Sequence, residues 1–395
     1  MRYTLPMTLA PQQHPELKSY RDEFPILSRQ TYFNSCSMGA LSTRTLAALS
    51  EYTDLWNTQG AAAWYELWMG KIDELRAAYA RLIGAQTGEI GLAHSVSAGL
   101  SVLTSCVDFS KRPRVIFSNL DFPTLGYQIQ AKQRLGVEPV MLPSPDGVRV
   151  PLEDFERAID ERTALVCTSR VYFTSGYIQD VAALAELAHR KGALLLVDGY
   201  QATGQVPVDV HAAGIDFLTS GSLKWLLGGV GIGFVYAPER LLPTLHPTIS
   251  GWFAHARQFD FDITELDLAP DARRLQLGTP AIPAVYTALA GLSIIHEIGV
   301  RRIRERLMYL VADLVDRLTA AKFRLRIADD PQRRAAIVMV ENDDPAPIVE
   351  QMAGRDITVD WRPGAVRLSP HFYNTVAENK RVVETLQALT AGVPA

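Results

Sequence analysis

The chain has 395 residues, of which 48% are hydrophobic and 21% charged, so it is long enough for two globular domains and contains no apolar stretch of membrane-spanning length. Its formal net charge of −4 gives no basic surface, which argues against nucleic acid or an anionic membrane as a main partner. Three scattered cysteines exclude a disulfide framework, and with a start that lacks a secretory signal they predict a cytoplasmic location.

Taken in chain order, the first residues are polar and predict an arm that lies over the body of the protein. From about Thr31 to Tyr236, apolar strands alternate with helical segments, a pattern typical of a mostly parallel sheet wrapped by helices. Three segments read as buried strands, and an amphipathic helical pattern precedes the last of them. These segments are the strands 114–118, 164–168 and 193–198, with the helix at 180–191.

After Pro283 a helical pattern runs to about Ala320 and is interrupted near Gly299, so we expect a spine that joins two domains. The remaining sequence predicts the strands and helices of a smaller α+β domain. We therefore predict an α/β fold with a mixed, mostly parallel sheet. Its expected divisions are an arm over residues 1–25, a large domain over residues 26–255, and a linker helix with a small C-terminal domain over residues 256–395.

Two residues suggest the chemistry. Asp198 ends an apolar strand, and Lys224 follows in a run of small residues that includes Ser220 and Ser222. A lysine amine can form a Schiff base with an aldehyde cofactor, and a carboxylate at a strand end can keep a basic ring nitrogen protonated. Alone, Asp198 could be a helix cap or a magnesium ligand, and Lys224 a surface amine. Together they predict a large domain that binds pyridoxal 5′-phosphate (PLP).

Other segments suit the same cofactor, each with an ordinary alternative. Gln201 could bond a ring hydroxyl or be a solvated turn residue. Residues 94–99 precede an apolar helix, so their amides and the Ser97 hydroxyl could hold a phosphate, although a serine N-cap gives the same pattern. Phe122 could stack on the pyridine or belong to the core. Arg367 could clamp a substrate carboxylate or form a structural ion pair.

Several other chemistries are excluded by spacing. A dinucleotide fingerprint fails at Phe234, and no HExxH, GxxxxGK[ST] or GxSxG motif occurs. The eight histidines do not fall at metal-ligand intervals, so we expect no metal site. Spacing alone decides nothing about Trp252 or Thr279.

Taken together, these segments resemble the class V branch of the aminotransferase superfamily, the fold-type I PLP enzymes. This branch includes cysteine desulfurases, kynureninases, isopenicillin epimerase-like proteins and aminotransferases. The resemblance runs from about Tyr32 to the last helix and is most specific from Leu196 to Lys224. It implies a PLP-dependent enzyme with an amino-acid substrate, and a homodimer in which each site is completed by the neighbouring subunit.

The resemblance also assigns roles to single residues. It implies that Lys224 carries the Schiff base, that Asp198 pairs with the pyridine nitrogen and that Gln201 approaches the ring hydroxyl. Ser97 and Ala98 match the phosphate loop of the family.

Further positions match the family at the substrate side. Thr279 matches a phosphate contact donated across the dimer, Arg367 the clamp on the substrate carboxylate, and Asn34 a position near the substrate. The Phe122 segment, at the ring-stacking position, and the Trp252 segment look kynureninase-like.

Two positions depart from the family pattern. Leu223 stands where desulfurases have histidine and kynureninases tyrosine, and Gly221 replaces the desulfurase serine. Part of the family's usual set of phosphate contacts is therefore missing, and Ser222 or Ser220 could substitute for it. A persulfide-forming desulfurase needs a cysteine in the C-terminal third, but the last cysteine is Cys167, so that mechanism is excluded. A direct C–S lyase remains possible, because it needs no catalytic thiol.

The expected mechanism starts from an external aldimine with an amino acid. Arg367 holds the carboxylate, and the released Lys224 removes the α-proton to give a carbanion. Our first interpretation is cleavage of a β-substituted amino acid, of the C–S or C–C lyase type and kynureninase-like. The alternative is a class V aminotransferase or epimerase that acts on a small amino acid. A PLP-binding regulator is disfavoured, because the arm has no room for a helix-turn-helix domain, and the substrate itself stays open.

Overall fold

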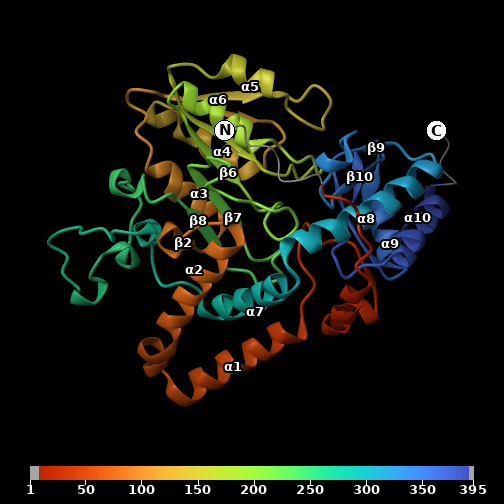
Figure 1. Ribbon diagram of the computed structural model, residues 1–395, viewed down its shortest axis with the longest axis horizontal. Helices are drawn as coiled ribbons and strands as arrows, with labels where there is room; N and C mark the ends of the chain where they lie inside the picture. Colours follow the sequence, from red (N-terminus) through yellow and green to blue (C-terminus); the bar gives the residue numbers. More distant parts are fainter. Residues whose placement is uncertain (1–8, 391–395) are drawn as a thin grey trace.

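The computed structural model describes residues 9–390 (Figure 1). Residues 1–8 of the expected arm and residues 391–395 of the expected small domain lie outside the described residues. Two sheets dominate the structure, a seven-stranded sheet built from the first two thirds of the chain and a four-stranded sheet near its end. We call them the large sheet and the small sheet.

The large sheet has the strand order β2-β8-β7-β6-β5-β3-β4. β8 runs antiparallel to both of its neighbours, and the remaining pairs are parallel. This confirms the expected α/β fold with a mixed, mostly parallel sheet. The strands are β2 (Ile90–Ala93), β3 (Arg114–Ser118), β4 (Glu138–Leu142), β5 (Thr163–Ser169), β6 (Leu194–Asp198), β7 (Phe217–Gly221) and β8 (Gly233–Tyr236).

Helices cover both faces of the large sheet, as a parallel sheet requires. Successive side chains of a strand point to opposite faces, and both sets are apolar here. Phe117 and Leu196 pack on the face covered by α3 and α4, whereas Ile116 and Leu195 pack on the face of α2, α5, α6 and α7. The helices around this sheet are α1 (Thr43–Gln59), α2 (Met69–Ile83), α3 (Val96–Ser105), α4 (Pro123–Ala131), α5 (Leu152–Ala158), α6 (Val181–Arg190) and α7 (Ile282–Ile298).

A broken helical spine leads to the small sheet (Figure 1). α7 stops at Gly299, whose φ of 86° is costly for residues with a side chain, and α8 (Val300–Ala320) continues in a new direction. The small sheet is antiparallel with the order β12-β13-β10-β9, flanked by two helices. Its elements are β9 (Leu325–Arg326), β10 (Val338–Glu341), α9 (Pro345–Ala353), β12 (Asp360–Arg362), β13 (Ala365–Leu368) and α10 (Val376–Thr390).

The start of the described chain lies against the C-terminal part. β1 (Thr31–Tyr32) pairs in parallel with β11 (Ile357–Thr358). Before it, the short helices η1 (Pro15–Glu23) and η2 (Pro25–Ser28) follow the surface, and Arg21 forms a 2.9 Å ion pair with Glu378 of α10. The domain boundaries at residues 25 and 255 stay predictions.

Short helical turns complete the structure. A π-helical turn precedes α2, and the other turns are 3₁₀ helices. The π-helical turn is η3 (Trp64–Trp68). The 3₁₀ helices are η4 (Thr87–Glu89), η5 (Lys132–Leu135), η6 (Leu242–Thr244), η7 (Trp252–Ala254), η8 (Gln258–Asp260), η9 (Ala272–Leu275) and η10 (Pro331–Arg333).

Between residues 9 and 390, no single helix is long and apolar enough to cross a membrane. Only α7 and α8 taken together meet the criteria of length and apolarity, and the two are bent by 79° relative to each other. Most of the apolar side chains of both helices are buried inside the protein.

Candidate active site

A cavity of about 150 Å³ lies at the carboxyl ends of the parallel strands of the large sheet. Ligands of open α/β sheets bind at this edge, because the loops that follow the strands enclose a crevice there. β6 ends at Asp198, and Lys224 follows shortly after the end of β7. The residues around the cavity include His94, Ser97, Phe122, Asp198, Tyr200 and Lys224.

The amine of Lys224 is shielded from water. Burial lowers its pKa to about 8, although the nearby Cys36 and Asp198 act in the opposite direction. Its Nζ lies 4.1 Å from the centre of the Tyr200 ring and 5.7 Å from the centre of the Phe122 ring. A lysine with such a pKa is partly neutral near pH 7, so its lone pair lets it act as a nucleophile or a base.

Asp198 is a buried carboxylate that lines the same cavity. Its Oδ1 accepts a hydrogen bond of 2.8 Å from the backbone N–H of Tyr200, and among residues 9–390 no basic side chain forms a salt bridge with it. Burial raises its pKa, and the hydrogen bond from Tyr200 and the charge of Lys224 offset this only in part. A cationic group placed in the cavity would therefore be stabilised by Asp198.

The amide of Gln201 is held on both sides. Its Oε1 accepts a hydrogen bond of 2.8 Å from the indole N–H of Trp225, and its Nε2 donates to the carbonyl oxygen of Cys36 at 2.9 Å. Gln201 also lines the innermost part of the crevice, beside Lys224. Trp225 therefore fixes the orientation of the amide, which keeps one N–H group for a ligand.

The first turn of α3 forms another wall of the cavity. Ser95 is the N-cap, and its Oγ accepts a 3.1 Å hydrogen bond from the N–H of Ala98. The N–H groups of Val96 and Ser97 have no carbonyl within the helix to bond, so they can bind an anion. The exposed Ser97 hydroxyl donates to Thr124 at 3.3 Å. A serine cap and an anion site therefore coexist here, and the cap is Ser95.

The ring of Tyr200 fills the space beside Gly221. A Cβ atom built on Gly221 would lie 2.8 Å from a ring carbon and 3.1 Å from the phenol oxygen. Such carbon–carbon distances are shorter than packed atoms allow, so a serine at this position would collide with the ring. The departure at Gly221 is therefore coupled to Tyr200, whose hydroxyl lies where the side chain of residue 221 would be.

The hydroxyls of Ser222 and Ser220, which were expected to replace a phosphate contact, already have partners within the chain. The Ser222 hydroxyl donates to the carbonyl oxygen of Gly229 at 2.8 Å, and the Ser220 hydroxyl is bonded to that of Thr203. Both serines are fully buried, and neither lines the cavity. These hydroxyls therefore hold the turns around Lys224 together, and their role as phosphate ligands stays a prediction.

Arg367 lies in β13 with its guanidinium buried and bonded. Its Nε and Nη2 donate to the two oxygens of Asp360 at 2.7 and 2.5 Å, Nη2 also donates to Ser37 at 2.8 Å, and Nη1 donates to the carbonyl of Phe173 at 3.1 Å. Burial would raise the pKa of Asp360, but the Arg367 guanidinium holds it below its usual value. The ion pair, our alternative to the substrate clamp, is therefore formed, and one N–H of Nη1 is left over.

Asn34 lies on a segment that runs past Lys224. It forms a parallel bridge with Ser369, and its Oδ1 is buried without a hydrogen-bond partner in the described part of the chain. On the same segment, Gly39 donates its N–H to the carbonyl of Leu223 at 2.9 Å and has no room for a side chain. A buried amide oxygen without a partner costs about 1–3 kcal/mol, so a ligand that donates to it would gain stability.

Trp252 and Thr279 do not line the Lys224 cavity. Trp252 is 41% exposed and borders a separate surface hollow of about 510 Å³ formed by residues 250–266. Thr279 is exposed, in the irregular segment before α7. Within one chain, therefore, neither residue can touch a ligand bound to Lys224, and a role for them requires a second subunit.

The aminotransferase class-V family model matches residues 31–379. An uncharacterized aminotransferase of Bacillus subtilis, YcbU, is 35% identical over 94% of this chain and 98% of its own. The chain belongs to the class V aminotransferase family. A kynureninase of Geobacillus thermodenitrificans is 27% identical over 95% of this chain and 92% of its own.

Solved structures of class V proteins have the same fold. A cysteine desulfurase of Thermococcus onnurineus superposes with a TM-score of 0.86 at 23% identity, over 98% of this chain and all of the other. The cystine C–S lyase C-DES, in complex with cysteine persulfide, has a TM-score of 0.85 at 22% identity, over 92% of this chain and 99% of its own. The chain is thus a fold-type I enzyme that depends on PLP.

The residues of the cavity fit this cofactor. Asp198 is a buried carboxylate that forms no salt bridge among residues 9–390, and a protonated pyridine nitrogen would supply the missing partner. The desolvated Lys224 amine suits the aldehyde, and the open amides at the start of α3 suit the phosphate. Among residues 9–390, no group of three or more metal-ligating side chains is arranged to hold a metal ion.

Sequence reasoning missed two parts of this class V site. Tyr200 was overlooked, although a glycine in place of the family's serine is the signal that a bulky neighbour fills the gap. Asp360 was also overlooked, and here the signal is a hairpin. Asp360 pairs with Arg367 across the β12–β13 turn that contains Pro363 and Gly364, so the two side chains share one face of the sheet.

Proposed function

We propose that the protein is a lyase that cleaves the side chain of a β-substituted amino acid. The observation that carries this proposal is a small aromatic-walled space directly beside the Lys224 amine. Phe122 and Phe173 meet there edge to face at 5.2 Å, and Tyr200 closes the other side. Such walls suit an apolar or sulfur-containing substituent at Cβ. Kynureninase relatives, at 27–28% identity over most of the chain, support the same reaction class.

The chain's own residues would divide the work as follows. PLP, when bound, supplies an electron sink for negative charge at the α-carbon of the substrate. Asp198 would hold the proton on the pyridine nitrogen, because among residues 9–390 its carboxylate forms no salt bridge with a basic side chain. Lys224 Nζ accepts the α-proton, since its lowered pKa makes it partly neutral. Arg367 offers its remaining N–H to the substrate carboxylate while Asp360 holds the guanidinium in place.

Two balanced outcomes belong to this proposal. Hydrolytic cleavage consumes water and gives alanine and the carboxylic acid of the released side chain. Elimination also consumes water and gives pyruvate, ammonium and the protonated leaving group. Each requires one base near the α-carbon, and Lys224 is the one amine among the residues that line the cavity.

A class V aminotransferase is the second candidate, because the 35% identical relative carries that name. An aminotransferase returns the substrate as an intact keto acid and needs a second keto acid to accept the amino group. A lyase returns a shortened product and needs no acceptor. The two proposals therefore differ in their products and in their requirement for an acceptor.

Product analysis of the holoenzyme separates these proposals. Kynurenine and S-substituted cysteines are offered with and without 2-oxoglutarate, and alanine, pyruvate and keto acids are measured. The lyase proposal predicts alanine or pyruvate in equal amount to the released fragment, without an acceptor. An intact keto acid that appears only with 2-oxoglutarate would overturn it in favour of the aminotransferase. Lys224→Ala serves as the inactive control.

We further propose that Tyr200 replaces the phosphate ligand lost at Gly221. Its hydroxyl lies beside the position where a residue-221 side chain would stand, and the residue lines the cavity. A phenol O–H donates to a phosphate oxygen as well as a serine does. The contact to the cofactor phosphate would thus come from Tyr200, just after the end of β6, and not from residue 221 at the end of β7.

We also propose a homodimer that completes each site. Trp252, Phe259 and Phe261 form an aromatic cluster on the surface, and Ile263 beside it is 96% exposed. Contiguous exposed apolar side chains of this kind mark an interaction surface. Thr279 reaches a phosphate only if a second subunit brings it there. The cytoplasmic location stays a proposal, based on the scattered cysteines.

Sedimentation or light scattering tests the dimer. Ile263→Glu places a charge in the apolar cluster and should yield monomers. Leu135→Glu, which changes an equally apolar side chain that is 75% exposed in η5, is the matched control and should leave the dimer intact. A wild-type monomer, or an Ile263→Glu dimer as stable as wild type, contradicts the proposal.

A further inference from the structure

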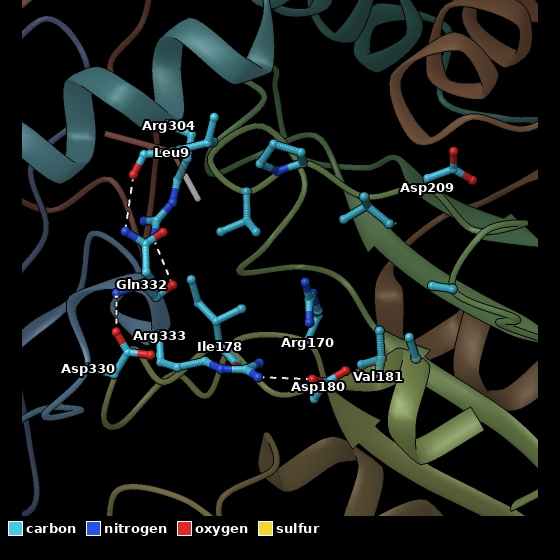
Figure 2. A pocket seen from close by; sticks show the side chains of 15 residues that line it. Leu9, Arg170, Ile178, Asp180, Val181, Asp209, Arg304, Asp330, Gln332 and Arg333 are labelled. Carbon is cyan, nitrogen blue, oxygen red and sulfur yellow. Dashed lines mark hydrogen bonds and ion pairs between the residues drawn. The ribbon is translucent and has the colours of Figure 1, made fainter. Parts of the chain in front are cut away.

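A second cavity, of about 330 Å³, lies between the large sheet and the small sheet (Figure 2). It shares no lining residue with the Lys224 cavity. The start of α6 and the segment 206–213 contribute from one side, and α8 and η10 from the other. Leu9 of the arm borders it as well. Nothing in the proposed reaction uses this space.

Most of the cavity wall is aliphatic. Small-molecule sites have this character, with a few polar groups that fix the orientation of the ligand, and their volumes begin near 300 Å³. The apolar side chains that form the wall include Leu9, Ile178, Val181, Val206, Pro207 and Val208.

The carboxylates around the cavity already have partners. Asp180 forms a 2.9 Å ion pair with Arg333 and caps α6 through the N–H of Ala183. Asp330 caps η10, and Asp209 accepts a 2.9 Å hydrogen bond from the N–H of Ala212. These three acids are therefore held by neighbouring groups of the rim.

Arg304 of α8, unlike the Asp180 carboxylate, forms no ion pair in the described part of the chain. It is 4% exposed and lines the cavity, and its Nη1 and Nη2 donate to the carbonyls of Arg334 and Gln332 at 2.6 and 3.1 Å. Among residues 9–390 no carboxylate forms a salt bridge with it. Burial and the nearby Arg170 lower its pKa to about 10, so it stays charged at neutral pH. Buried charges in proteins are normally paired with an opposite charge.

Arg306, on the same helix, shows what a purely structural buried arginine looks like here. It donates to three carbonyls, those of Phe372, Gln13 and Asn374, which tie the arm to the chain before α10. Arg304 has two such bonds and keeps further N–H groups on the side of the cavity. A structural role therefore accounts for Arg306 but leaves part of the Arg304 guanidinium unused.

We propose that this cavity binds a small monocarboxylate with an apolar body, whose carboxylate is received by Arg304 beside Arg170. The planar guanidinium matches the two oxygens of a carboxylate, and the aliphatic wall matches the rest of the ligand. A doubly charged phosphate fits less well, because Asp180, Asp209 and Asp330 surround the same space. The lining joins α6 and the segment 206–213 to α8 and η10, so a ligand would hold these elements in their present arrangement.

Calorimetric titration of the holoenzyme tests the proposal. The probes are hexanoate and benzoate, with hexanamide, benzamide and inorganic phosphate as matched comparisons. We expect the carboxylates to bind and to raise the unfolding temperature, and the amides and phosphate to bind about tenfold more weakly or not at all. Equal binding of carboxylates and amides, or no binding of either acid, overturns the proposal.

Two variants locate the site. Arg304→Met keeps the length of the side chain and removes the charge, and it should weaken benzoate binding by about tenfold or more. Ala182→Phe fills the cavity without changing any charge, so it should also abolish binding and decides the question if Arg304→Met does not fold. Arg302→Met, on the exposed side of α8, is the control that should bind as wild type does. Unchanged binding in Ala182→Phe places the ligand elsewhere and contradicts the proposal.

Discussion

The Lys224 cavity and the Arg304 cavity each contain a buried basic side chain, and the two side chains respond to burial in opposite ways. Burial lowers the pKa of Lys224 to about 8, so the amine can lose its proton and react. Burial leaves Arg304 with a pKa of about 10, so it remains a cation and requires an anion. The same desolvation thus produces a nucleophile in one place and an anion-binding site in the other.

The largest effect that would test this contrast is the loss of the amine. Lys224→Ala should reduce turnover by about a hundredfold to ten-thousandfold, because the α-proton loses its base. Borohydride reduction of the PLP-loaded protein should then leave no cofactor attached at position 224, as mass spectrometry of the peptide will show. Arg304→Met, the matched change in the other cavity, should keep both turnover and the label. Full turnover in Lys224→Ala refutes the assignment.

A smaller loss is expected for Asp198→Asn. The amide keeps the shape of the carboxylate but removes the negative charge that would hold the pyridine proton, so turnover should fall by about a hundredfold. The affinity of the protein for PLP, measured by fluorescence titration, should fall as well. Asp180→Asn, at the rim of the second cavity, should leave both quantities near wild type, and an Asp198→Asn enzyme as fast as wild type would contradict the role.

The pH dependence separates the two cavities directly. PLP capture by the apoprotein needs a neutral amine, so its rate should rise about tenfold per pH unit below pH 8 and level off above it. Benzoate binding at Arg304 should stay flat from pH 6 to pH 9, because the guanidinium is still protonated there. Stopped-flow absorbance and calorimetry give the two profiles. A capture rate that is flat across pH 8 disagrees with a desolvated lysine.

The smallest effect concerns Tyr200→Phe, which removes one hydroxyl and keeps the ring beside Gly221. One hydrogen bond to a charged phosphate contributes about 1.5–3 kcal/mol, so the dissociation constant of PLP should rise by about tenfold to a hundredfold. Equilibrium dialysis measures this constant. Tyr127→Phe, at an exposed position, is the control. An unchanged dissociation constant in Tyr200→Phe would mean that the α3 amides bind the phosphate without help from Tyr200.

The two cavities also differ in how far each could be predicted from the sequence. Apolar runs gave the strands that become β3, β5 and β6, and the acid at the end of β6 with a lysine among small residues was enough to predict the cofactor. These signals are local, because strand ends and the turns after them are continuous in sequence. Arg304 had no such signal, since its cavity combines side chains from the arm, α6, α8 and η10.

Within the active site itself, the sequence could not predict the contacts that join distant segments. Ser222 was expected to bind a phosphate, and in the folded chain its hydroxyl donates a hydrogen bond to the carbonyl oxygen of Gly229. Arg367 was predicted to clamp a substrate carboxylate or to form a structural ion pair, and the sequence did not reveal that the hairpin brings Asp360 opposite to it. Trp252 was grouped with the cofactor ligands, although its segment lies on the surface of one chain. Residue types and spacing do not determine which of several possible partners a polar side chain finally meets.

The pairing of β1 with β11 has a consequence for the order in which the protein becomes functional during synthesis. The segment after β1 carries Ser37 and Gly39, which contact Arg367 and the backbone at Lys224. A ribosome-bound chain can assemble the large sheet early, but this segment has no strand to pair with until residues 357–358 have emerged. Vitamin B6 should therefore be retained by the nascent polypeptide only near the end of translation.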